Sequence, residues 1–147
     1  MPEINKCQYG EPKEKIQQDA YRTSAAHSLA LILQYHQMPA NTSLLYRELQ
    51  VGSQDISDEV VRLLRKLGLK SRRCSSSPSR LMKVSLPAIA EMSDGTFVLL
   101  AKANGQEVVT ATGDGSPPLI TELEEFCRLW SGKLICATTR VRLMGSD

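Results

Sequence analysis

The first part of the chain repeats its apolar residues with the period of a helix. Between positions 23 and 37 the apolar residues form two rows, one of Leu29, Ile32 and Leu33 and one of Ala25, Leu31 and Tyr35. Two apolar faces predict a helix that lies at the centre of the domain. We expect this helix to begin at Thr23 or Ser24, because a hydroxyl there can cap the free N–H groups of the first turn.

Two shorter helices are predicted next. The segment 41–49, NTSLLYREL, begins with side-chain acceptors from Asn41 to Ser43, and Gly52 follows as a stop. The segment 55–70, DISDEVVRLLRKLGLK, has Ser57 as a predicted cap and Gly68 as its end. The apolar positions of this helix are Val60, Val61, Leu63, Leu64 and Leu67.

The remaining pattern is that of strands. Extended segments are predicted at LKSRRCS (69–75), VSLPAIAEM (84–92), TFVLLAKA (96–103), EVVTAT (107–112) and KLICATTRV (133–141). The words SDG and NGQ between them are hairpin turns, and TELEEFCRLW (121–130) is a helix with an acidic start. Three helices followed by a meandering antiparallel sheet with one more helix predict an α+β domain.

Composition removes several classes of function. The formal charge is +2, so no global field requires a nucleic acid or a membrane as partner. No apolar run reaches the roughly 18 residues of a membrane-spanning helix. Four cysteines, Cys7, Cys74, Cys127 and Cys136, show no zinc-ligand spacing. We therefore expect structural thiols in a reducing compartment, with neither a metal nor a cofactor.

Four sequence segments resemble, in this order, segments of a known protein family: SLALILQYHQ, LLRKLGLKSR, SLPAIAEMSDGTFVLLAK and LEEFCRLWSGKLI. Their order and spacing are similar to the papain-like domain at the N-terminus of bacterial ABC exporters. One branch of that family consists of cysteine peptidases that trim leader peptides. Another, in the haemolysin and cyclolysin exporters of type I secretion, is peptidase-like without the chemistry. The resemblance implies a papain-like fold over 18–140, after a flexible segment 1–17 and before a linker 141–147 to an absent membrane domain.

The resemblance also assigns the catalytic positions. The family places its cysteine eleven residues before the tyrosine of Tyr-His, which is Ser24 in this chain. Its histidine opens a strand, where GTFVLL offers Thr96, and its aspartate falls on Thr112, with Asp114 two residues later. The oxyanion glutamine is matched by Gln18. A serine without an imidazole lacks the base that acyl transfer needs, so no catalytic residue is expected.

Other catalytic candidates are weaker. His27 follows Ser24 by three residues on the same helix, but nothing in the sequence orients the ring or builds an oxyanion pocket. Cys7 lies in a polar segment well before the helix. We expect both to be structural, and we expect Ser24 to act as a helix cap.

A basic stretch stands out from the rest of the surface. Between Val60 and Val84 there is no acidic residue and there are eight basic ones: Arg62, Arg65, Lys66, Lys70, Arg72, Arg73, Arg80 and Lys83. Such a stretch is either a solvated face or a patch for an anionic partner. No aromatic residues are interleaved with it, which argues against nucleic acid.

The sequence thus predicts a catalytically inactive, peptidase-like domain on the cytoplasmic face of the bacterial inner membrane. Its expected partner is an unfolded secreted polypeptide, such as the acidic calcium-binding-repeat proteins that the resemblance implies, along with the exporter's own membrane and nucleotide-binding domains. The expected contact residues are Ser24, His27, Thr96, Arg72 and Arg73. An active leader peptidase and a regulatory module of the exporter's ATPase remain as alternatives.

Overall fold

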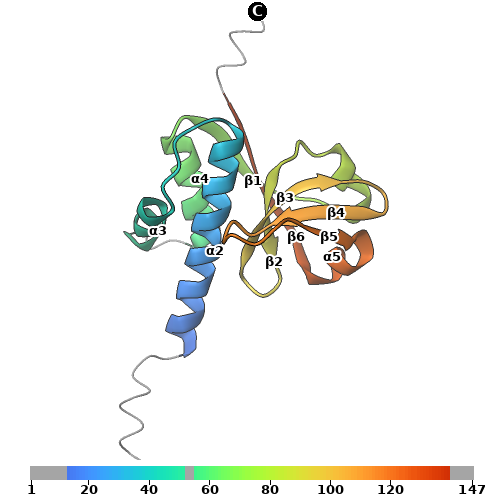
Figure 1. The fold of residues 1–147 in the computed structure, drawn as a ribbon, viewed down its shortest axis with the longest axis horizontal. Coiled ribbons are helices and arrows are strands. Elements are labelled where there is room, and N and C mark those ends of the chain that lie inside the picture. Colours follow the sequence, from blue (N-terminus) through green and yellow to red (C-terminus); the bar gives the residue numbers. More distant parts are fainter. Residues whose placement is uncertain (1–12, 52–54, 140–147) are drawn as a thin grey trace, which may run out of the picture.

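A computed structural model describes residues 13–51 and 55–139, and it consists of helices packed on an antiparallel sheet (Figure 1). The helices are α2 (Lys13–Tyr35), α3 (Thr42–Val51), α4 (Ile56–Lys66), the 3₁₀ helix η1 (Pro78–Lys83) and α5 (Leu123–Leu129). The strands are β1 (Leu69–Ser75), β2 (Ala88–Met92), β3 (Phe97–Ala103), β4 (Glu107–Ala111), β5 (Leu119–Glu122) and β6 (Trp130–Thr139). The predicted α+β class is confirmed.

The helical layer differs from the prediction at its start. Helix α2 begins at Lys13 and not at Thr23 or Ser24, so Ser24 lies inside the helix and caps nothing. Helix α3 starts as expected, since the Leu44 N–H donates to Asn41 Oδ1 at 3.1 Å. The predicted cap of α4 is wrong, because its N-cap is Asp55.

The sheet has the strand order β1-β6-β2-β3-β4-β5. Strands β2, β3 and β4 form the predicted meander, but β6 leaves it and pairs with both β1 and β2. Strand β5 was not predicted, and it pairs with β4 at one edge of the sheet. The other edge is β1, which carries part of the basic stretch.

Two hydrophobic cores lie on the two faces of the sheet. Helices α2, α3 and α4 cover one face, where Leu29, Ile32 and Leu33 are buried as predicted, although Tyr35 is exposed. The opposite face, which we call the open face, holds a smaller core around Leu81, Phe126 and Trp130. Figure 1 shows α5 on the far side of the sheet from the three helices. No helix in 13–51 or 55–139 has the length and apolar character required to cross a bilayer.

Candidate functional site

The hydroxyl of Ser24 is held between the helix and the sheet. Its Oγ donates to the carbonyl of Tyr21, 2.9 Å away, and accepts the N–H of Phe97 at 2.9 Å. Phe97 is the first residue of β3 and is almost fully buried. The Ser24 side chain therefore links the middle of α2 to the start of β3, and its proton is directed at a backbone oxygen.

Thr96 lies next to this link, in the turn between β2 and β3. Its N–H and its Oγ1 both donate to Asp94 Oδ1, at 2.9 and 2.7 Å. The turn rests directly on α2, because a Cβ added to Gly95 would lie 2.7 Å from the ring of Tyr21. The fold thus brings the positions of Ser24 and Thr96 together, with a threonine bonded to its own turn where the resemblance places an imidazole.

The third position, Thr112, lies in the loop after β4. Thr112 Oγ1 donates to Asp114 Oδ1 at 2.7 Å, and the Ser116 N–H donates to the same oxygen at 3.0 Å. These bonds, first from Thr112 and then from Ser116, lower the pKa of the Asp114 carboxyl from 3.8 to about 2. The carboxylate of Asp114 is therefore engaged by its own exposed loop.

His27 packs behind that loop. A Cβ added to Gly113 would meet the backbone oxygen of His27 at 3.0 Å and its Cβ at 3.1 Å. The His27 side chain also lines a pocket of about 360 Å³ between α2 and α3, together with Thr42 and Tyr46. Both hydrogen bonds of the Ser24 hydroxyl go to backbone groups, so the described residues show no Ser24–His27 pair.

Two of the candidate site residues lie wholly or partly outside the described part of the structure. Cys7 lies outside the described residues, and so does the side chain of Gln18, whose backbone belongs to α2. Within the described part of the chain, no group of three or more His, Cys, Asp or Glu side chains could hold a metal ion. The chemistry available around Ser24 is therefore that of a hydroxyl with two backbone partners.

The two expected contact residues Arg72 and Arg73 point to opposite faces of the sheet, because neighbours in a strand alternate. Arg73 faces the helices and binds Glu91 through two bonds, Nε to Oε2 at 2.7 Å and Nη2 to Oε1 at 2.8 Å. Glu91 is buried and also accepts a bond from Ser57 at 2.9 Å. The bond to Glu91 raises the pKa of the Arg73 guanidinium. Arg73 thus forms a structural ion pair with Glu91. The sequence did not reveal this pair, because Glu91 is distant from Arg73 in the chain.

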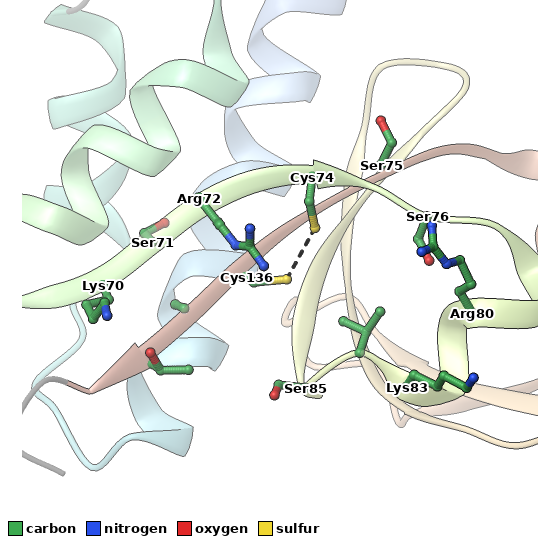
Figure 2. A pocket seen from close by; sticks show the side chains of 13 residues that line it. Lys70, Ser71, Arg72, Cys74, Ser75, Ser76, Arg80, Lys83, Ser85 and Cys136 are labelled. Carbon is green, nitrogen blue, oxygen red and sulfur yellow. Dashed lines mark hydrogen bonds between the residues drawn. The ribbon is translucent and has the colours of Figure 1, made fainter. Parts of the chain in front are cut away.

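Arg72 instead faces a pocket on the open face of β1 and β6 (Figure 2). The pocket measures about 820 Å³, and we call it the basic pocket after Lys70, Arg72, Arg80 and Lys83 in its lining. Lys70 and Arg72 come from β1, while Arg80 and Lys83 come from η1. None of the described carboxylates lines it.

Two thiols also face the basic pocket. Cys74 Sγ and Cys136 Sγ lie 3.6 Å apart across the β1–β6 pair (Figure 2). Burial, followed by the contact with Cys74, raises the pKa of the Cys136 thiol to about 12. Alternation along the two strands would have placed both thiols on one face, but the pairing of β1 with β6 was not evident from the sequence.

The comparisons with known proteins fit this fold. A sequence model described as the Peptidase C39 family matches residues 13–142. The chain is 26% identical over 125 residues to the alpha-hemolysin translocation ATP-binding protein HlyB of Escherichia coli, covering 83% of this chain and 18% of that protein. It is 33% identical over 113 residues to the cyclolysin secretion/processing ATP-binding protein CyaB of Bordetella pertussis, covering 74% and 16%. The chain therefore spans less than a fifth of the length of these relatives.

Solved structures share the architecture. A double glycine motif protease from an AMS/PCAT transporter, in complex with its leader peptide, superposes with a TM-score of 0.69 at 22% identity, covering 78% of this chain and 82% of that one. The peptidase domain of Streptococcus ComA gives 0.71 at 16% identity, with 81% and 93% covered. An N-terminal peptidase C39 like domain of a toxin secretion ATP-binding protein from Vibrio parahaemolyticus gives 0.61 at 21%, with 80% and 97% covered. The papain-like fold is confirmed by these likenesses.

Proposed function

This chain belongs to the Peptidase C39 family, and we propose that it is a member that binds an unfolded secreted polypeptide for an ABC exporter without cleaving it. The observation that carries the proposal is the hydrogen bonding of the Ser24 hydroxyl. Its hydroxyl is committed to the Tyr21 carbonyl and the Phe97 N–H, at the position where the family's nucleophile is expected.

The chemistry of that position supports binding without cleavage. A serine hydroxyl needs a neighbouring base to become a nucleophile, and the residue beside it is a threonine already bonded to Asp94. Threonine cannot accept and return a proton near neutral pH as an imidazole can. Asp114, the nearest carboxylate in the sequence to the third position, is held by Thr112 and Ser116.

The relatives support a polypeptide as partner. One is named for the translocation of alpha-hemolysin and another for the secretion or processing of cyclolysin, and a protease of the same fold was solved with a leader peptide bound. For this chain the partner is an unfolded secreted polypeptide, presented at the cytoplasmic face of the inner membrane as part of a larger exporter. Binding is reversible and weak, since ordering a disordered chain is costly and the polypeptide must be released for transport.

A digestion experiment tests the absence of cleavage. The purified domain is incubated with a leader peptide that carries a double glycine motif, and the products are read by mass spectrometry. We expect an intact peptide from the native chain and also from Ser24→Cys, because the variant still lacks a base at Thr96. Specific cleavage that disappears in Cys7→Ser would overturn the proposal and assign a peptidase.

A titration tests the binding. The ¹⁵N-labelled domain is titrated with one secreted protein in its unfolded form and then in its folded form. We expect shifts of defined amides with the unfolded form alone. Equal shifts with both forms, or none with either, would contradict recruitment, and a change in ATP turnover of the whole exporter without polypeptide binding would indicate a regulatory module instead.

A further inference from the structure

The basic pocket carries charge that no described carboxylate neutralises. No ion pair involves Lys70, Arg72, Arg80 or Lys83 within the described residues, and all four are exposed. The other basic residues of the same stretch are engaged: Arg62 binds Glu59, Lys66 lies 3.5 Å from Glu48, and Arg65 donates to the Ser71 carbonyl. Four free cations around one hollow favour an anionic ligand.

The spacing of the cations suits an extended chain. Lys70 and Arg72 are alternate residues of β1, so their side chains leave the same face at a repeat of about 6.6 Å. An extended peptide has the same repeat, and carboxylates at every second position would face these two cations as cross-strand pairs. Arg80 and Lys83 are three residues apart in η1, and a 3₁₀ helix aligns such positions on one side.

The edge of the sheet supplies backbone partners for such a chain. Ser76 N–H donates to the Gly132 carbonyl on β6, whereas Arg65 reaches the Ser71 carbonyl from outside the sheet. Even-numbered residues of β1 therefore bond to β6, and odd-numbered residues direct their backbone groups outward. Since β1 is an edge strand, the N–H and C=O groups of Arg73 and Ser75 are placed to pair with an added strand.

The hollow beside the side chains of Lys70 and Arg72 is elongated. A second pocket of about 280 Å³ shares Ser85, Ala137 and Thr138 with the basic pocket, so the hollow continues along β6. The second pocket is lined by Tyr35 and His36, whereas no described aromatic side chain lines the basic pocket itself. A nucleotide base beside the four cations would therefore find no aromatic ring to stack on, and the cationic part of the hollow fits a polypeptide better than a nucleotide.

We infer that an extended acidic segment of the secreted polypeptide pairs with the edge of β1 and directs carboxylates at alternate positions toward Lys70 and Arg72, at the rim of the basic pocket. This inference rests on the proposed function and adds to it the surface and the chemistry of the segment recognised. It moves the contact away from Ser24 and Thr96 to the open face of the sheet.

Fluorescence anisotropy with a labelled peptide of six Ser-Asp repeats tests the inference at low ionic strength. We expect binding by the native domain, none with six Ser-Asn repeats, and weaker binding when the six aspartates are placed in one block. The variant Lys70→Glu with Arg72→Glu should bind the alternating peptide about tenfold more weakly, because attraction becomes repulsion. Titration of the labelled domain should move the amides of Arg73 and Ser75.

Two further variants keep the test clear of folding effects. Arg80→Glu with Lys83→Glu alters the other wall of the pocket and should also weaken binding. Lys102→Glu reverses one charge at an exposed residue of β3 outside the pocket, and it should leave binding within about twofold. Thermal unfolding of each variant confirms that it is folded.

Native-like affinity in both double variants, or equal affinity for the Ser-Asn peptide, would overturn the pocket assignment. If the unfolded secreted polypeptide binds the native domain and the Lys70→Glu, Arg72→Glu variant equally, the pocket assignment fails and the proposed function stands. If the acidic peptide binds but the unfolded polypeptide does not, the proposed function fails.

Discussion

Two regions of this molecule differ in whether their polar side chains have partners within the chain. Beside the helix-covered face, the Ser24 hydroxyl is bonded to the Phe97 N–H and the Thr96 hydroxyl is bonded to Asp94. In the basic pocket, on the open face, Arg72 and Lys83 find no carboxylate among the described residues. Adjacent residues of β1 show the same difference: Arg73 binds Glu91, and Arg72 does not.

The contrast separates structural from functional polarity. Polar groups that are satisfied inside a protein stabilise the fold and have little left to offer a ligand. Groups that remain unsatisfied at a hollow surface are the ones a partner can complete. In this chain the Ser24 hydroxyl belongs to the first kind, and the cations of the basic pocket belong to the second.

The largest difference is expected when the two adjacent arginines are replaced one at a time. Arg73→Met should lower the free energy of unfolding by about 2–4 kcal/mol, because it leaves the buried Glu91 carboxylate without its cation. Arg72→Met, the matched control, should change it by less than about 0.5 kcal/mol. Equilibrium unfolding in urea measures both. Equal destabilisation by the two variants would contradict the division between the faces.

A smaller effect is expected at Ser24. Ser24→Ala leaves the buried N–H of Phe97 without an acceptor and should cost about 1–2 kcal/mol of unfolding free energy. Thr23→Ala is the control, since Thr23 Oγ1 donates only to the exposed Asp19 carbonyl. The same unfolding measurement applies. A neutral Ser24→Ala would show that the hydroxyl is not a structural link and would reopen its use in chemistry.

The smallest effect concerns Asp114. Its folded pKa of about 2 lies below its ordinary value of 3.8, so the carboxylate stabilises the loop above that ordinary value and loses the contribution as the pH falls through about 2. We expect the Ser116 amide resonance to titrate with a midpoint near pH 2, and to stay flat in Asp114→Asn. A midpoint near 3.8 would mean that the bonds from Thr112 and Ser116 are not formed in solution.

The sequence predicted the helices and most strands because their apolar spacing is local information. It missed the early start of α2, since the residues before Ser24 are polar and gave no apolar row to follow. It also missed β5, whose residues Leu119 and Ile120 are exposed and lie at an edge, so burial left no alternating pattern. Local propensity is a weak guide at such places.

The site was predictable only as positions in the chain. Counting along the sequence paired Ser24 with Thr96, and the Ser24–Phe97 bond brings these two positions near each other. The division of the basic stretch was not predictable, because it depends on which strand face meets α4 and on the distant partner Glu91. Pairings of high sequence separation decide which charges remain free, and a linear pattern does not contain them.

The placement of β6 has a consequence for the order of assembly. It is the last strand in the described chain, yet it lies between β1 and β2, with Leu69 paired to Thr139. During synthesis β1 gains its neighbour in the described sheet only after β6, the strand furthest from it in the sequence, has been made. Such non-local closure is slow and leaves a cationic strand exposed meanwhile, so the nascent domain acquires its edge, and the surface beside it, only as its final step.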